Sequence, residues 1–124
     1  MSKIILILFI LLNSALTWSQ AEFQFNESTH KFPKTEEGVL LEHDYTFTNT
    51  GTEPLIISEI KVSCSCTKFT YPKEPILPGQ MGTIHVTFDT KDKSEFQNRT
   101  LSIYSNTKKS PEKIRFKVLV ISHK

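Results

Sequence analysis

Apolar and polar residues alternate at every second position through much of this chain, a period typical of β-strands whose two faces meet different surroundings. The clearest run covers residues 39–48, where the polar side chains fall mainly on one face. The other face carries Val39, Leu41, His43, Tyr45 and Phe47. Beyond the first twenty residues no stretch has the apolar spacing of an amphipathic helix, so the sequence predicts an all-β protein.

Turn-forming residues divide the remaining chain into short strand-like segments. Turns are expected at 49–54 and around the prolines and glycine of 72–79. The predicted strands lie near 22–25, 30–32, 39–48, 55–62, 81–89, 101–105 and 114–121. Seven or eight antiparallel strands at these intervals predict an immunoglobulin-like β-sandwich. The Cys-Trp-Cys core of antibody domains is excluded, because the single tryptophan, Trp18, lies near the N-terminus.

The first twenty residues have a different character. Lys3 supplies a positive charge, residues 4–12 are continuously apolar, and small or polar residues follow. This order is typical of a signal peptide, with cleavage expected after Ser19 or Gln20. The apolar run is much shorter than the roughly 20 residues that cross a membrane. We therefore predict a signal peptide at 1–19, a single domain at 20–124, export to the periplasm or the medium, and no stable membrane insertion after cleavage.

The charge balance argues against polyanionic partners. The chain has 15 basic and 13 acidic side chains, and its basic residues are scattered along the sequence rather than grouped in one segment. Nucleic acid and anionic membranes are therefore not expected as partners.

The only two cysteines, Cys64 and Cys66, are separated by a single residue. An exported protein ordinarily oxidises a favourable cysteine pair. Residues two apart in an extended strand stand about 6.6 Å apart, so a mutual disulfide would need a bulge or a turn. Four alternatives stay open: burial as small apolar side chains, a mutual disulfide with redox-responsive behaviour, metal binding, or pairing with cysteines of another protein.

Copper is the metal that this pair favours. Two thiolates on one face would form a soft chelate suited to Cu(I), and His43, on the inward face of its strand, could be a third ligand. A closed zinc site would need two histidines from elsewhere, since no second cysteine pair exists. The competing interpretation of His43 is a core histidine bonded to the backbone.

No residue combination predicts catalysis. The chain has no GxSxG elbow, and its acidic pairs lie in turn-like contexts typical of solvated surface. We therefore predict no catalytic residues, no cofactor, and a non-catalytic module that binds or assembles with an unknown protein, with strand addition at a sheet edge as one route. The alternative is a thiol-based copper-binding or redox-responsive protein that uses Cys64 and Cys66.

An ordered series of motifs resembles one known family. The motifs are Phe47-Thr48-Asn49-Thr50-Gly51, Glu53-Pro54-Leu55-Ile56-Ile57, Cys64-Ser65-Cys66-Thr67, Pro75-Ile76-Leu77-Pro78-Gly79-Gln80 and Ser105-Asn106. Together they resemble the fifteen-seventy-three family of domains of unknown function. The resemblance implies an exported immunoglobulin-like sandwich of Bacteroidetes-type bacteria and supplies no activity. Members usually have glycine where this chain has Ser65, and often where it has Glu95.

Overall fold

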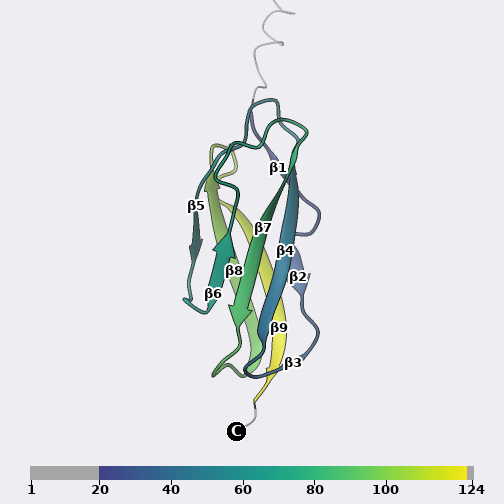
Figure 1. Ribbon diagram of the computed structural model, residues 1–124, viewed down its shortest axis with the longest axis vertical. Coiled ribbons are helices and arrows are strands. Elements are labelled where there is room, and N and C mark those ends of the chain that lie inside the picture. Colours follow the sequence, from purple (N-terminus) through teal and green to yellow (C-terminus); the bar gives the residue numbers. More distant parts are fainter. Residues whose placement is uncertain (1–19, 123–124) are drawn as a thin grey trace, which may run out of the picture.

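The computed structural model describes residues 20–122, and within them the protein is all-β, with two sheets packed face to face (Figure 1). The predicted signal peptide at 1–19 lies outside the described residues. Figure 1 shows an elongated sandwich whose strands run along its long axis. The predicted fold class is confirmed.

Sheet 1 has the strand order β1-β4-β7-β6, and its neighbouring strands are antiparallel. Its central pair is long, with nine matched positions from Leu40↔Asp89 to Thr48↔Met81. The four strands are β1 (Phe23–Phe25), β4 (Leu40–Asn49), β6 (Thr67–Thr70) and β7 (Met81–Asp89).

Sheet 2 has the order β2-β9-β8-β5, with β3 beside β9 farther along the same edge. Its central pair, β8 and β9, is antiparallel from Glu95↔Val120 to Ile103↔Glu112. The five strands are β2 (Thr29–Lys31), β3 (Thr35–Glu36), β5 (Ile57–Val62), β8 (Glu95–Ser105) and β9 (Glu112–Ile121).

Two features of the fold differ from the sequence-based expectation. Residues 20–122 contain nine strands rather than seven or eight, because β3 and β6 were not predicted. Both are too short for a recognisable alternation, with two and four residues. In addition, β2 and β3 run parallel to β9, so sheet 2 is mixed rather than purely antiparallel. A connection that crosses from one sheet to the other permits this direction, which residue alternation alone does not reveal.

The core lies between the sheets and follows the predicted alternation. In β4 the buried side chains include Tyr45 and Phe47, and in β9 they include Phe116 and Val118. Burying such side chains stabilises the fold by about 1.5–3 kcal/mol each. Tyr45 also joins the sheets directly, because its hydroxyl donates a hydrogen bond of 2.6 Å to the Arg115 carbonyl oxygen. Burial raises the pKa of the Tyr45 phenol, so this donor stays protonated.

The turn after β4 is held by a buried asparagine. The Asn49 side chain is fully buried, and its amide nitrogen donates to the carbonyl oxygens of Glu53 (2.8 Å) and Ile76 (2.9 Å). Its amide oxygen accepts from the backbone N–H of Gly51 (2.9 Å) and Glu22 (3.2 Å). One side chain thus connects β1, the turn and the proline-rich loop.

Candidate functional site

The cysteine loop, residues 63–66, joins the two sheets. Strand β5 ends at Val62 and β6 begins at Thr67, so the chain turns where both cysteines lie. The Cα atoms of Cys64 and Cys66 are 5.2 Å apart and a disulfide joins their sulfur atoms. The turn is closed by hydrogen bonds from Cys66 N to Cys64 Sγ (3.2 Å) and from Thr67 N to the Cys64 carbonyl oxygen (3.1 Å). The turn brings the two residues closer than an extended strand would hold them.

Charged side chains of both signs border the cysteine loop. An open hollow beside it is lined by both cysteines, by Lys68, Lys91 and Lys93, and by two carboxylates, Asp89 and Asp92. Positive charge near a cysteine favours the thiolate over the thiol, and negative charge opposes it. If the disulfide were reduced, the three lysines would favour the thiolates and the two carboxylates would partly offset them.

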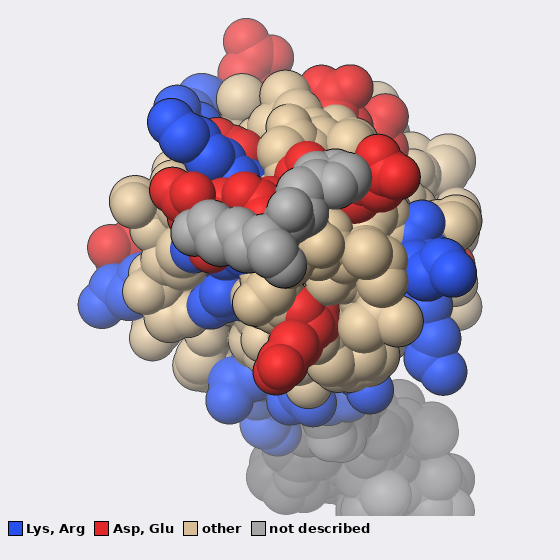
Figure 2. Space-filling model, turned by 90° about the horizontal axis from the view of Figure 1, so that it is seen from below, with Lys and Arg blue, Asp and Glu red and all other residues tan. Residues whose placement is uncertain are grey.

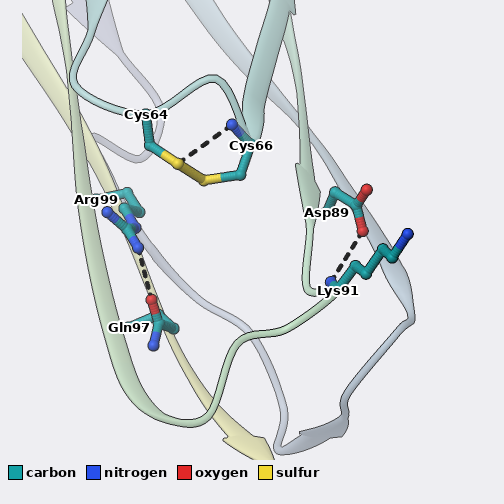
Figure 3. The surroundings of a disulfide bond; sticks show 6 residues. All are labelled: Cys64, Cys66, Asp89, Lys91, Gln97 and Arg99. Atoms are coloured by element: carbon teal, nitrogen blue, oxygen red, sulfur yellow. Dashed lines mark hydrogen bonds between the residues drawn. A yellow bond between two sulfur atoms is a disulfide. The ribbon is translucent and has the colours of Figure 1, made fainter.

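Figure 3 shows the surroundings of the disulfide, with Asp89 of β7 on one side and Arg99 and Gln97 of β8 on the other. The Asp89 backbone N–H donates a bond of 2.9 Å to the Cys66 carbonyl oxygen, which ties the loop to β7. Arg99 of β8 donates a bond of 2.7 Å to the Gln97 side-chain oxygen, and its guanidinium carbon stands 5.7 Å from the Phe88 ring centroid. The loop thus lies against strands of both sheets.

The third predicted copper ligand lies elsewhere. The Cys66 carbonyl oxygen is hydrogen-bonded to the Asp89 N–H of β7. Asp89 is in turn the cross-strand partner of Leu40 in β4, which lies three residues before His43. Two strand spacings across the sheet and three residues along it separate the Cα atoms of Cys66 and His43 by about 14 Å. The structure therefore brings the two cysteines together and does not bring His43 to them.

His43 instead stacks on another histidine. Its ring lies 3.6 Å from that of His30, with an interplanar angle of 10°. Glu27 Oε1 is 2.6 Å from His30 Nδ1 and 3.9 Å from His43 Nε2. Burial lowers the pKa of His43, and the neighbouring His30 lowers it further. Within residues 20–122 the His43 ring makes no hydrogen bond to the backbone, and the carboxylate near it is that of Glu27.

His85 has a different environment on the outer face of sheet 1. Its Nδ1 lies against Asp44 Oδ1, and its Nε2 is 3.5 Å from Glu42 Oε1. The hydrogen bond to Asp44 raises the pKa of His85. Within residues 20–122 the side-chain hydrogen bonds given for His30 and His85 go to carboxylates, and neither pairs with a serine or cysteine.

The outward face of sheet 2 gathers basic side chains that are far apart in the sequence. On β9 every second residue from Lys113 to Lys117 points away from the core, and Lys31 of β2 is matched with Lys117. We call this surface the basic face; its residues are Lys31, Lys61, Lys113, Arg115 and Lys117. Against these five cations the outward positions of the same sheet carry two carboxylates, Glu36 and Glu59. The face therefore has a net charge of about +3.

The opposite face of the sandwich, the outward face of sheet 1, has a net negative charge. The outward positions of sheet 1 include Glu42, Asp44 and Asp89 with a single lysine, Lys68. Among residues 20–122 no ion pair joins any cation of the basic face to a carboxylate. Lys31 and Lys117 occupy facing positions on β2 and β9, and like charges on facing strand positions destabilise a sheet.

Apolar side chains lie at one end of the basic face. Phe96 is 63% exposed, and its cross-strand neighbour Leu119 is 40% exposed. Ile121, two residues farther along β9, is 42% exposed. A shallow hollow beside Phe96 is rimmed by Lys31 and Lys117. We call Phe96, Leu119 and Ile121 the apolar end.

Figure 2 looks at the lower end of the molecule, where β9 finishes. Acidic side chains gather around the centre of this view, and basic ones lie mainly toward its rim. The acidic residues of this end include Glu36, Glu37, Asp92 and Glu95, which the β3–β9 and β8–β9 pairings and the loop contacts bring together. The apolar end therefore lies between a basic face and an acidic tip.

The basic face was missed by reasoning from the sequence. The lysines are scattered along the chain, yet the register of β2, β5, β8 and β9 places them on one surface. A detectable signal was present in the period-two spacing of Lys113, Arg115 and Lys117. The contributions of Lys31 and Lys61 could not be found without the strand pairing.

Two sheets packed around a shared core, without a helix in the described residues, define an immunoglobulin-like β-sandwich. The family model described as "Protein of unknown function (DUF1573)" matches residues 23–120, so the chain belongs to that family. The family resemblance inferred from the sequence is confirmed. None of the curated proteins matches the chain.

Solved structures share the fold at low sequence identity. A protein of unknown function from Porphyromonas gingivalis W83 is similar with a TM-score of 0.70 and 17% identity, covering 86% of this chain and 50% of that one. The ASH/PapD-like domain 7 of human CEP192 has a TM-score of 0.61 and 13% identity, covering 86% of this chain and 89% of the domain. The Vibrio cholerae VesB protease has a TM-score of 0.62 and 10% identity, covering 82% of this chain and 32% of the protease.

These likenesses concern the fold alone. The chain spans half of the Porphyromonas gingivalis protein and about a third of the protease. A domain of unknown function with PapD-like neighbours is compatible with a non-catalytic module. No helix of residues 20–122 has the length and hydropathy to span a membrane.

Proposed function

We propose that this protein is an exported, non-catalytic β-sandwich module that binds an acidic protein surface through its basic face and apolar end. The observation that carries this proposal is the gathering of five cations, none ion-paired to a carboxylate within residues 20–122, beside Phe96 and Leu119. Exposed aromatic side chains and arginine are enriched at the energetic centres of protein interfaces. Duplex nucleic acid would use the charge but leave Leu119 and Ile121 uncovered, which favours a protein as partner.

The sheet edges are less suited to a partner than this face. Strand β6 has four residues and β1 has three, so an added strand would gain few backbone hydrogen bonds. The edge strand β5 has six residues and a bulge between Ile57 and Glu59. A flat face of long strands, β8 and β9, offers a larger contact area.

Charge reversal on the two faces tests this function. The double variant Arg115→Glu, Lys117→Glu should release the protein from its complex in a native envelope extract, measured as a return to the monomer's elution volume. Thr83→Glu, Thr87→Glu on the outer face of sheet 1 is the matched control and should leave the complex intact. An elution profile that is monomeric for the unmodified protein, or turnover of a glycan, ester or peptide in a broad substrate screen, contradicts the proposal.

The alternative is a thiol-based redox-responsive or copper-binding protein that uses Cys64 and Cys66. The hollow beside the cysteine loop supports it, because its three lysines outnumber its two carboxylates and positive charge favours the thiolates that bind Cu(I). Intact-mass spectrometry of the exported protein, with alkylation and copper quantification, tests this function. Stoichiometric copper on two reduced cysteines supports it; a Cys64→Ser, Cys66→Ser double variant with unchanged copper uptake and redox response refutes it.

A further inference from the structure

The side chains of Glu27, His30 and His43 converge at the seam between the two sheets. Glu27 lies between β1 and β2, His30 belongs to β2 of sheet 2, and His43 belongs to β4 of sheet 1. One ligand atom from each falls within 4.8 Å of the other two. The fold thus brings together three possible metal ligands, from two strands and a loop. This cluster is distinct from the cysteine loop.

We propose that Glu27, His30 and His43 bind a divalent transition-metal ion, with zinc as the best match. Imidazole nitrogens suit zinc and its neighbours in the first transition series, whereas calcium and magnesium prefer oxygen ligands alone. Two histidines and one carboxylate form an open three-residue ligand set. The fourth position would be left for water or for a group of a partner.

The distances are close to those of a zinc site. Zinc binds nitrogen and oxygen at about 2.0–2.1 Å, so tetrahedral ligand atoms stand about 3.4 Å apart. Glu27 Oε1 is 2.6 Å from His30 Nδ1 and 3.9 Å from His43 Nε2, one distance shorter and one longer than this value. The Glu27 side chain is 50% exposed, which leaves it free to adjust by the fraction of an ångström required.

The stacked rings require one further movement. A metal lies in the plane of the imidazole that binds it, but the His30 and His43 planes are almost parallel and 3.6 Å apart. One ring therefore has to turn about its Cβ–Cγ bond for both to bind one ion. Their side chains are 24% and 23% exposed, so neither is enclosed by protein on all sides.

Aromatic rings lie on the inner side of the cluster. The edges of the Phe32 and Tyr45 rings border the pair, at 4.6 Å from His30 and 4.7 Å from His43. This aromatic wall limits the access of water on the inner side of the cluster.

Isothermal titration of the untagged mature protein with zinc chloride at pH 7.5, after removal of metal by a chelator, tests the proposal. We expect one ion per chain with micromolar or tighter affinity. The variants Glu27→Gln, His30→Gln and His43→Gln should each weaken binding at least tenfold. His85→Gln is the matched control, because His85 also sits beside two carboxylates, and it should change the affinity less than twofold.

Two further readouts keep the test independent of folding. Circular dichroism establishes that each variant keeps the β-sheet spectrum, and histidine ring resonances in the unmodified protein should shift for His30 and His43 but not for His85. Lowering the pH to 5.5 should weaken zinc binding at least tenfold, since protons compete for both imidazoles. The proposal is overturned by the absence of saturable binding, by binding that survives in His30→Gln and His43→Gln, or by binding lost in the Cys64→Ser, Cys66→Ser variant.

Discussion

Replacing Asn49 by aspartate should destabilise the protein severely, although the two side chains have nearly the same shape. In the native turn the amide nitrogen donates to the carbonyl oxygens of Glu53 and Ile76, at 2.8 and 2.9 Å. A carboxylate would place an acceptor opposite these two acceptors, in a position with no solvent exposure. The bonds accepted from Gly51 and Glu22 would remain.

The magnitude follows from one lost bond and one buried charge. The Glu53 carbonyl oxygen would lose its described partner, whereas the Ile76 carbonyl oxygen keeps a bond of 2.8 Å from the Leu55 N–H. A buried acceptor without its partner costs about 1–3 kcal/mol, and a buried carboxylate facing two carbonyl oxygens adds a similar cost, so the total is about 3–4 kcal/mol after partial relaxation. A domain of this size has a total stability of about 5–15 kcal/mol. With a urea m-value of about 1.5 kcal/mol/M, the unfolding midpoint should fall by about 2 M.

Urea unfolding followed by circular dichroism, at pH 7 and pH 5, measures this loss. Burial raises the pKa of the introduced carboxyl above its unfolded value, so the folded protein takes up the proton first as the pH falls. The free energy lost relative to the unmodified protein should therefore be fully present at pH 7 and smaller at pH 5. A protonated carboxyl can again donate to one of the two carbonyls.

Asn106→Asp is the matched control. The Asn106 side chain makes similar bonds, from Nδ2 to the Pro54 carbonyl oxygen and from the Ile56 N–H to Oδ1, both 2.9 Å, but it is exposed to water. Its replacement should cost about 1 kcal/mol or less. Equal losses in the two variants, or a loss below 1 kcal/mol for Asn49→Asp, would refute the reasoning about buried unpaired acceptors.

The remaining predictions concern backbone and charge. Glu95→Gly should raise the melting temperature by about 2–6 °C. Glu95 has a φ of 66°, a conformation that costs a residue with a side chain about 1–2 kcal/mol, and the greater entropy of an unfolded chain with glycine offsets part of the gain. A thermal scan that shows no increase refutes this. Ser65→Gly should lower it slightly, since Ser65 is not among the described residues with positive φ. Gly51→Ala should cost about 1–3 kcal/mol in urea titrations, because the added methyl would overlap the Gln20 carbonyl oxygen. His43→Gln should reduce the stability lost between pH 7.5 and pH 5.5, since the lowered pKa of His43 makes the folded state resist a proton that the unfolded state accepts. His85→Gln should have the opposite effect on the pH dependence of stability. The raised pKa of His85 gives the folded protein stability below pH 6.5 that is lost as the pH rises, and the variant lacks this contribution.

The long strands could be predicted from the sequence because their alternation is regular over many residues. β4 and β9 bury the inward residues that the pattern indicated, from Tyr45 and Phe47 to Phe116 and Val118. The short strands β3 and β6 carry too few residues for a period to emerge. Their existence depends on backbone pairing with β9 and β7, which is a tertiary property.

The candidate sites show the same division between local and tertiary information. The need for a turn between Cys64 and Cys66 follows from local strand geometry, and a turn is present. The neighbours of His43 depend on how β2 of sheet 2 approaches β4 of sheet 1, so its stacking on His30 could not be inferred from the spacing of residues. At Glu95, where family members often have glycine, the structure has a positive φ that was not predicted from the sequence.

Site-specific photo-cross-linking in cells that produce this protein tests the proposed binding surface most directly. A benzophenone amino acid would replace Phe96 or Ser102 on the outward face of sheet 2, and Thr83 or Thr87 on the outward face of sheet 1 as controls. The account predicts a discrete protein adduct from the sheet 2 positions alone, and loss of that adduct when Arg115→Glu and Lys117→Glu are added. Adducts of equal yield from both faces, adducts only from sheet 1, or no protein adduct from either face would contradict it.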